Sequence, residues 1–215
     1  MQHLIAYLST DEQLALAALL VDYGPGFMPA ANKRVGIEGT LQRPPYTPAM
    51  WRDFVESHDR SKGTSEVFAI LTKNEAAEGG WRYIGHTGLH HITWPNGTAT
   101  TGSMIVDGEY RGKGYGTAAK LLLLYHAFRI LGLRKVHSRV KAWNAASLGH
   151  LVKCGYTVCG RNREEDLHEG AFVDQLLLEV FKSDWEEVWE TYQAASHLPK
   201  LDKAQRALVK KETNT

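Results

Sequence analysis

Hydrophobic and polar positions in the N-terminal part of the chain predict two helices with a long loop between them. A helix is expected over residues 11–22, because the stretch Thr10–Gln13 forms a capping-box pattern ahead of a periodic apolar run. Residues 24–47 are rich in Gly and Pro and keep no sustained period, which predicts a long ordered loop with room for one short helical turn. The pair Thr47-Pro48 then predicts the start of a second helix, over residues 48–58.

Segments rich in residues that favour strands predict an antiparallel meander in the middle of the chain. Its strands are expected at residues 66–72, 82–94 and 98–106, with turns at Gly79-Gly80 and Pro95-Asn96-Gly97. Residues 116–131 are apolar on nearly every side, which predicts a buried helix. The remaining elements are expected to be a strand at 135–143, a helix at 145–154 and strands near 156–163 and 171–182. This order predicts an α/β (α+β) fold, with a mixed sheet built as one domain.

The C-terminal part carries an aromatic stripe on a predicted helix. Ser183 and Glu186 form a second capping-box pattern. The stripe consists of Trp185, Val188, Trp189 and Tyr192, at helical spacing. It is expected to dock on the parent domain, with a homodimer contact as the alternative. A polar tail with helical propensity begins at Lys200, so we expect a domain over 1–183 and a C-terminal helical extension over 184–215.

Composition and charge narrow the class of protein. The formal net charge of the 215 residues is +1, without the basic excess that nucleic-acid binders and membrane-surface proteins usually carry. The longest uninterrupted apolar run covers residues 14–21, which is too short to span a bilayer. The first residues lack the basic region of a signal peptide, and Cys154 and Cys159 are expected to be reduced. These features predict a cytoplasmic protein with neither nucleic acid nor membrane as a partner.

The stretch EYRGKGYGTAAKLLL, residues 109–123, places a glycine-rich basic loop directly ahead of the predicted buried helix. Glycine is a poor helix former, so helix stability does not explain this composition. Backbone N–H groups of such a turn and of the first helical turn point the same way and can bind a phosphate, to which Arg111 and Lys113 add charge. The Walker pattern does not fit residues 111–117, and the dinucleotide fingerprint fails at its third glycine. The loop therefore indicates a phosphate or pyrophosphate ligand.

Residues 111–116, R-G-K-G-Y-G, resemble the [RQ]-x-x-G-x-[GA] pyrophosphate loop of the GCN5-related N-acetyltransferases, the GNAT family. Two further motifs of the RimJ/RimL-like branch of this family follow in order and spacing. The N-x-x-S motif is similar to Asn144-Ala145-Ala146-Ser147, and the K-x-G-[FY] motif is similar to Lys153-Cys154-Gly155-Tyr156. The strand that precedes the loop in this branch is similar to residues 103–111. The resemblance covers about residues 5–185.

This resemblance implies a fold and a co-substrate site. The fold is a mixed, mostly antiparallel sheet flanked by helices, in which the parallel central strands 98–106 and 135–143 are splayed, and acetyl-CoA binds at the splay without a metal ion. The residues implied in binding are Met104, Ile105 and Val106 for the pantetheine amides, Arg111, Gly112, Lys113, Gly114, Tyr115, Gly116 and Thr117 for the pyrophosphate, and Asn144 for the pantetheine arm. Asn144 would also cap the following helix. Ser147 would touch the co-substrate near the thioester sulfur, either as general acid to the leaving thiolate or as a small packing residue.

The implied reaction moves the acetyl group of acetyl-CoA to a primary amine by direct attack, on a protein N-terminus or a small molecule. A lysine-like amine has a pKa near 10.4, so its reactive neutral form costs about 4–5 kcal/mol at pH 7 and a proton acceptor is needed. RimL-like relatives often carry a Glu early in the strand before the loop, where this chain has Thr101. The nearest substitutes are His86, His90 and His91, in the predicted strand 82–94. Because His90 and His91 point to opposite faces of that strand, at most one of them faces the acceptor.

Three alternatives stay open at this stage. The acidic residues of RNREEDLHEGAFVD, 161–174, either attract a cationic amine such as a polyamine or form a solvated hairpin. The missing Glu leaves a non-catalytic CoA-binding module, acting through protein contacts, as the alternative function. A different acyl-CoA is the third alternative, because the residues that contact the acyl group are not identified by these motifs.

Overall fold

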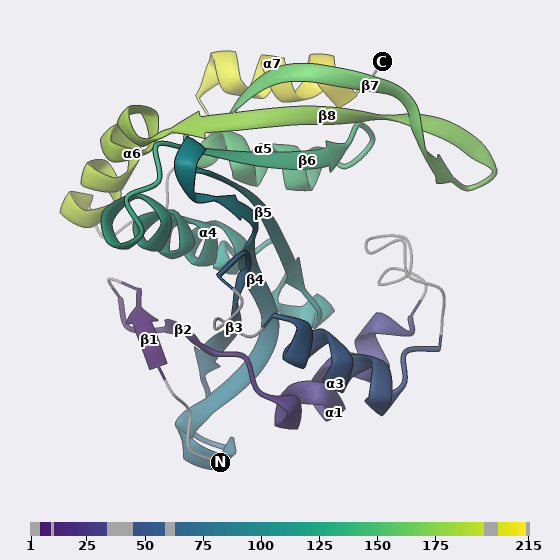
Figure 1. Cartoon of the computed structure of the whole chain (residues 1–215), viewed down its shortest axis with the longest axis vertical. Helices are drawn as coiled ribbons and strands as arrows, with labels where there is room; N and C mark the ends of the chain where they lie inside the picture. The colour runs from purple at the N-terminus through teal and green to yellow at the C-terminus, as the bar shows by residue number, and fades with distance from the viewer. Residues whose placement is uncertain (1–4, 10, 34–44, 59–62, 196–201, 214–215) are drawn as a thin grey trace. The chain divides into compact units, whose positions relative to one another are not determined.

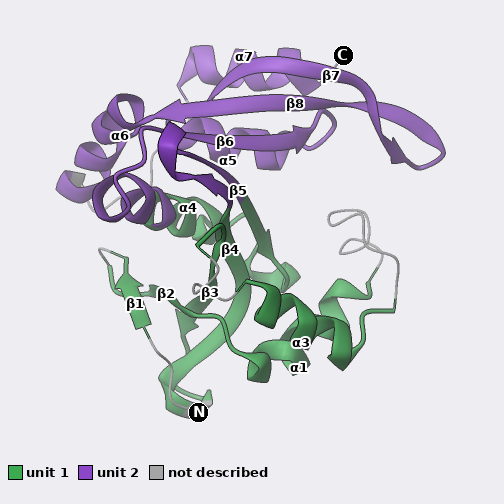
Figure 2. Cartoon of the chain, viewed as in Figure 1, with its two compact units in different colours: residues 1–90, 102–122 green, residues 91–101, 123–215 purple. Residues whose placement is uncertain are grey.

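The computed structural model of the chain describes residues 5–9, 11–33, 45–58, 63–195 and 202–213. The chain folds into two compact units, which we call unit 1 (residues 1–90 and 102–122) and unit 2 (residues 91–101 and 123–215; Figure 2). Backbone hydrogen bonds join the strands in the order β1-β2-β3-β4-β5-β6-β8-β7, an eight-stranded mixed sheet flanked by helices (Figure 1). The predicted α/β fold class is confirmed. The two units are described in turn, each by itself.

Unit 1 contains the antiparallel strands of the sheet that come first in the chain. They are β1 Ile5–Leu8, β2 Leu14–Ala18, β3 Glu66–Lys73 and β4 Trp81–Thr93, of which β4 ends in unit 2. The helix predicted over 11–22 is wrong, because β2 lies there and pairs with β3 along its whole length. A short run that is apolar at every position suits a strand buried on both faces as well as it suits a buried helix. The polar residues ahead of it form a turn, in which Asp11 accepts a hydrogen bond from the backbone N–H of Gln13.

The helix α3, Pro48–Ser57, begins as predicted. The side chain of Thr47 accepts a hydrogen bond from the backbone N–H of Met50 at 3.2 Å, and a proline occupies the first helical position. The buried ring of Trp51 donates from Nε1 to the carbonyl of Val21 at 2.8 Å, which fixes α3 against an earlier segment of the chain.

The loop predicted over residues 24–47 is wrong in its first part, where the chain forms the helix α1, Gly24–Ala31. Residues 34–44 of the predicted loop lie outside the described residues. α1 places Phe27 in the core of unit 1, where its ring stacks on Trp51 with centroids 4.5 Å apart. Stacked aromatic rings therefore join α1 to α3.

A β-bulge in β4 shapes its contact with β5, Thr98–Ile105. The pairing with β3 passes from Gly85 to Tyr83 and skips Ile84, which is the bulged residue. A Cβ atom at Gly85 would lie 2.1 Å from the carbonyl oxygen of Met104, so the close approach of the two strands requires glycine there. The bulge thereby sets the position of the end of β5, from which the glycine-rich loop departs.

Unit 2 contains the parallel part of the sheet. Its strands are the first half of β5 with β6 Lys135–Lys141, β7 Thr157–His168 and β8 Ala171–Phe181. β5 and β6 are parallel, and in the described residues their pairing ends at Thr101↔Ser138 although both strands continue, as expected for the predicted splayed pair. The β7–β8 hairpin turns on Glu169 and Gly170, whose φ angles of 49° and 87° are typical of a type I′ turn. The segment 161–174 is therefore mostly strand.

Helices of unit 2 bury the predicted aromatic stripe. The helices are α5 Ala145–Lys153, α6 Lys182–Ala195 and α7 Lys203–Thr213, with α4 Tyr115–Tyr125 entering from unit 1 and continuing as a π-helical segment, His126–Ile130. Trp185 and Trp189 of α6 are buried. Their rings lie 5.4 Å from Phe128 and 5.2 Å from Tyr125 between centroids, so the stripe packs inside its own unit. The division of the chain at residue 183 stays a prediction.

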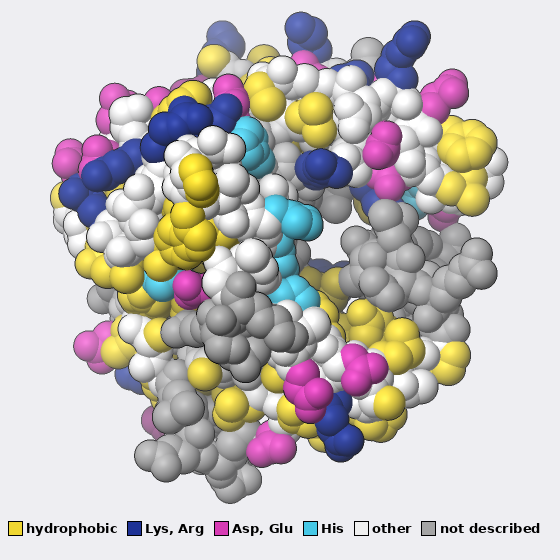
Figure 3. All heavy atoms as spheres, in the orientation of Figure 1, with side chains coloured by type: hydrophobic (Ala, Val, Ile, Leu, Met, Phe, Trp, Pro, Cys, Tyr) yellow, Lys and Arg dark blue, Asp and Glu magenta, His cyan; other side chains and the backbone are white. Residues whose placement is uncertain are grey.

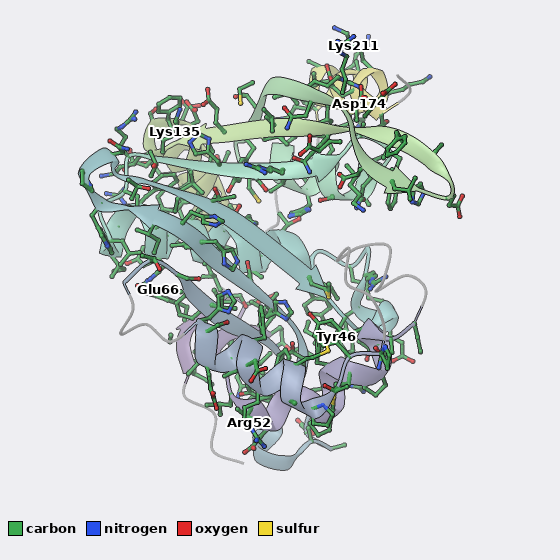
Figure 4. All side chains as sticks on the ribbon, turned by 45° about the vertical axis from the view of Figure 1, so that its right-hand side comes forward. Tyr46, Arg52, Glu66, Lys135, Asp174 and Lys211 are labelled. Atoms are coloured by element: carbon green, nitrogen blue, oxygen red, sulfur yellow. The ribbon has the colours of Figure 1, made fainter. Side chains whose placement is uncertain are left out.

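Arg161 ties α7 to the β7–β8 hairpin. Its guanidinium donates to the carboxylate of Asp174 at 2.9 Å, and to the carboxylate and carbonyl of Glu212 at 2.9 and 3.0 Å. Figure 4 labels Asp174 on β8, near the helix that carries Lys211. The backbone N–H of Glu164 and the guanidinium of Arg161 lower the pKa of Asp174, so this carboxylate stays charged below its ordinary range.

Replacing Asp174 with Asn is expected to loosen α7 without unfolding unit 2, because Arg161 then loses one of its two carboxylate partners. Amide hydrogen exchange over residues 203–213 should accelerate about two- to fivefold. Because the pKa of Asp174 is lowered, the contact is fully present above the ordinary Asp pKa and is lost only as the pH falls through the lowered pKa of the folded state. Glu165→Gln, which neutralises an exposed carboxylate of the same hairpin, is the control, and unchanged exchange in the Asp174 variant would contradict this role.

Acidic and basic side chains are interspersed over the face that Figure 3 shows. Of the acidic hairpin residues, Asp166 is buried and accepts a hydrogen bond from Gln175 at 3.3 Å, while Asp174 is held by Arg161.

Within the described ranges, no three His, Cys, Asp or Glu side chains lie together as metal ligands. None of the helices in the described part of the chain has the length and apolar character needed to cross a bilayer.

Candidate active site

The glycine-rich loop lies in unit 1, where it joins β5 to the N-terminus of α4. Gly112 and Gly114 have φ angles of +73° and +94°, which other residues rarely adopt. α4 begins at Tyr115, and the carbonyl of Gly114 accepts the first helical bond, from Ala118 at 3.0 Å. The N–H groups of the first turn have no acceptor within the helix, and the helix dipole adds partial positive charge. The loop therefore has the geometry of an anion site, and the side chain of Lys113 is exposed beside it.

Arg111 is bonded to the end of β5. Its Nε donates to the carbonyl of Ile105 at 2.9 Å, and a terminal nitrogen lies 3.5 Å from the carbonyl of Val106. The backbone N–H of Val106 donates to the carbonyl of Ile84 at 2.9 Å. In this structure Arg111 therefore orders the loop against the strand, and Ile105 and Val106 already have protein partners.

Asn144 and Ser147 lie in unit 2, at the start of α5. The side-chain oxygen of Asn144 accepts a hydrogen bond from the backbone N–H of Ser147 at 3.0 Å, so Asn144 caps α5. Because the cap uses only this oxygen, the NH₂ group of Asn144 keeps its capacity to donate. Ser147 is half-buried in the first turn of the helix.

Thr101, the residue in the position where the sequence resemblance led us to look for a Glu, is buried in unit 2. Its hydroxyl donates to the carbonyl of His137 at 3.2 Å and lies 2.9 Å from the hydroxyl of Tyr156. Burial raises the pKa of Tyr156 well above its ordinary value, so this hydroxyl stays protonated and hydrogen-bonded to Thr101. Thr101 and Tyr156 thus pack together as a structural pair.

A pocket of about 230 Å³ opens in unit 1 beside the first helices. Its lining consists of Phe27, Tyr46, Phe54, His86, His90, Gly102, Ser103 and Met104. Tyr46, labelled in Figure 4, comes from the segment just ahead of α3. Three of these side chains are aromatic, and no Asp, Glu, Lys or Arg is among the described residues that line the pocket.

His86 is a neutral imidazole in the wall of this pocket. Its Nδ1 lies 3.1 Å from the hydroxyl of Tyr83, and its ring is 5.4 Å from that of Phe54 between centroids. Desolvation, together with the neighbouring imidazoles of His90 and His58, lowers the pKa of His86 to about 4. His86 is therefore uncharged at pH 7.

His90 also lines the pocket, and the residues around it favour one tautomer. Ser65 donates its hydroxyl proton to the carbonyl of Leu89 at 3.2 Å, while its oxygen lies 3.2 Å from Nδ1 of His90. That oxygen can then accept from Nδ1–H, which leaves the lone pair of His90 on Nε2. A Cβ atom at Gly102 would lie 3.4 Å from Nε2, so this nitrogen lies beside Gly102, another residue of the lining.

The structure separates the two adjacent histidines that the sequence singles out. His91 is exposed in unit 2 with a φ angle of 50°, and it is not part of the pocket lining. No sequence motif indicates Ser65 or Tyr83. Ser65 reaches His90 because its neighbour Glu66 pairs with Leu89 of β4, whereas Tyr83 reaches His86 from the same strand, three residues away across the bulge at Ile84.

Comparisons with known proteins bear on the family and the fold of the chain. A family model described as an acetyltransferase (GNAT) domain matches residues 26–157. A spermidine N-acetyltransferase from Vibrio cholerae, in complex with CoA and spermine, superimposes with a TM-score of 0.71 at 21% identity, over 81% of this chain and 98% of that one. RimJ from Mycobacterium smegmatis, in complex with CoA-disulfide, gives 0.72 at 16% identity, over 87% and 91%. RimL, a ribosomal L7/L12 α-N-protein acetyltransferase, gives 0.70 at 17% identity, over 84% and 96%.

Proposed function

The chain belongs to the GNAT acetyltransferase family, and from this premise we propose that it transfers the acetyl group of acetyl-CoA to a primary amine. The observation that carries the proposal is the loop ahead of α4, in which two glycines with positive φ precede a helix N-terminus. Two of the similar structures contain CoA or its disulfide, which supports acetyl-CoA as the co-substrate. Membership of the RimJ/RimL-like branch is part of the proposal.

We assign the binding of the co-substrate to the residues that match the family's motifs. The backbone N–H groups of the loop, residues 111–117, would hold the pyrophosphate, with Lys113 adding charge. Residues 104–106 and Asn144 remain the proposed partners of the pantetheine arm. Ser147 remains the proposed partner of the leaving thiolate.

His90 is the proposed proton acceptor. The amine nitrogen attacks the thioester carbonyl carbon, the new C–N bond forms and the C–S bond breaks. The proton lost by the amine passes to Nε2 of His90, directly or through water, and the released thiolate takes up a proton. Ser65 acts as a positioning residue, because its oxygen keeps the other proton of the imidazole on Nδ1.

The competing proposal is a CoA-binding module without catalysis. Equilibrium binding of CoA, followed by release of free thiol from acetyl-CoA with a panel of amines and peptides, separates the two. Binding together with amine-dependent thiol release is the expected result. CoA binding without turnover on any amine or peptide would contradict the transferase and support the module. The same assay with other acyl-CoA thioesters tests the acyl chain.

Replacing Gly112 with Ala is expected to raise the KM for acetyl-CoA about tenfold. The added methyl group meets no atom within 4 Å, but the φ angle of +73° strains the loop that presents the N–H groups. Gly132→Ala is a matched control, because Gly132 has a φ of +68° and equally open surroundings. Both variants should lose about 1 kcal/mol of stability. An unchanged KM in the Gly112 variant would contradict the role of the loop.

A further inference from the structure

We propose that the acceptor is a primary amine borne on a compact apolar or aromatic group, which the pocket of unit 1 holds beside His90. This inference rests on the proposed function, because it names the class of amine that the transferase acetylates. The chemistry of the pocket lining, the size of the pocket and the charges around it support the inference independently.

The lining is apolar, with a few polar groups at one place. The rings of Phe27, Tyr46 and Phe54, with the side chain of Met104, supply its apolar surface. Phe27 meets Tyr46 edge to face with centroids 5.0 Å apart, so these walls support each other. Two histidines of the lining, His86 and His90, bring polar side-chain atoms. An apolar wall with a few convergent polar groups is typical of a site that orients an apolar ligand by one functional group.

The size of the pocket suits a small group. At about 230 Å³ it is smaller than the roughly 300–1,000 Å³ of sites for drug-sized ligands. A single aromatic or branched aliphatic group with its amine fits this range. A long chain with several polar groups would extend out of it.

The charges of the lining disfavour a polyamine. The amine that reacts must lose its proton, so the pocket needs an acceptor such as His90 rather than a counter-ion. A polyamine brings further ammonium groups, and a buried ammonium is costly unless a carboxylate pairs with it. No carboxylate is among the described residues of the lining, and His86 is uncharged.

A primary amine on an apolar or aromatic group can belong either to a free small molecule or to the N-terminal residue of a peptide. 2-Phenylethylamine represents the first, a short peptide with N-terminal Phe represents the second, and spermidine is the cationic comparator. With the full chain and acetyl-CoA, kcat/KM for the better apolar substrate should exceed that for spermidine at least about tenfold. Whichever of the two apolar substrates is faster identifies the source, and either supports the inference.

A spermidine rate equal to or above both apolar substrates overturns this inference, while the transferase activity itself stands. Thiol release with none of the amines and peptides overturns the proposed function and this inference with it. The two failures are therefore distinguishable in one assay.

A carboxylate placed in the pocket should shift the substrate preference from the apolar amine toward spermidine. The side chain of Met104 lines the pocket and packs against the aromatic core beside it, so a Glu there can face a bound ammonium. Met104→Glu is expected to raise the spermidine-to-phenylethylamine ratio of kcat/KM roughly tenfold. Met104→Gln, of the same shape without charge, should leave the ratio unchanged. Equal ratios in both variants, each checked for an unchanged thermal midpoint, would overturn the inference, and the wild-type panel tests it even if a variant fails to fold.

Discussion

Replacing His90 with Gln is expected to lower kcat by about two to four orders of magnitude at pH 7, the usual contribution of a general base. Gln has no group that can take the amine's proton, but its amide can still bond to the oxygen of Ser65, which keeps the local packing. The KM for acetyl-CoA should change little. Steady-state rates of thiol release, with a saturating apolar amine, measure the effect.

His91→Gln serves as the comparator, because His91 is exposed in unit 2 and is absent from the lining. Its kcat is expected to stay within about twofold of the wild type. If the His91 variant loses more activity than the His90 variant, His90 is not the proton acceptor.

Replacing Gly85 with Ala is expected to reduce the free energy of unfolding by about 3–5 kcal/mol, at the upper end of single substitutions. The new Cβ would lie 2.1 Å from the carbonyl oxygen of Met104, and this neighbour is backbone that cannot rotate away. Either the bulge or the pairing of β4 with β5 must give way. Urea denaturation followed by far-UV circular dichroism measures the loss.

Gly26→Ala is the matched control for this substitution. Gly26 lies in α1, where an added Cβ would be 3.4 Å from the ring of Tyr83, an ordinary contact. Its stability should stay within about 1 kcal/mol of the wild type, because alanine favours a helix over glycine by a similar amount. Equal stabilities of the Gly85 and Gly26 variants would show that the close approach at Gly85 is not needed.

Local signals in the sequence predict much of the fold. The Thr47-Pro48 pair predicts the start of α3, and residues that favour strands predict β3, β4 and β5 with ends that agree within a few residues. The cap of α3 and the β-branched and aromatic residues of these strands carry the signal locally. β2 differs, because LALAA is apolar at every position and has no β-branched or aromatic residue, so neither its period nor its composition indicates a strand. The bulge at Ile84 also escapes prediction, since it depends on where β3 and β5 lie.

The candidate site likewise has one part that local sequence predicts and one part that it does not. The loop ahead of α4 and the cap formed by Asn144 are predicted because each is encoded by consecutive residues. The pocket is not, because Phe27, Tyr46 and Ser103 come from distant segments that tertiary packing brings together. The tautomer of His90 likewise depends on Ser65, which is 25 residues away in the sequence. Pairwise contacts of this kind leave no local pattern to find.

The most direct test of the central proposal is the initial rate of thiol release from acetyl-CoA, measured with and without 2-phenylethylamine. Mass spectrometry of the same reaction identifies the product. We predict a rate that depends on the amine and saturates with it, one N-acetylated amine formed for each thiol released, and loss of this rate in His90→Gln. Thiol release that is independent of every amine and peptide tried, or no release despite CoA binding, would contradict the proposal.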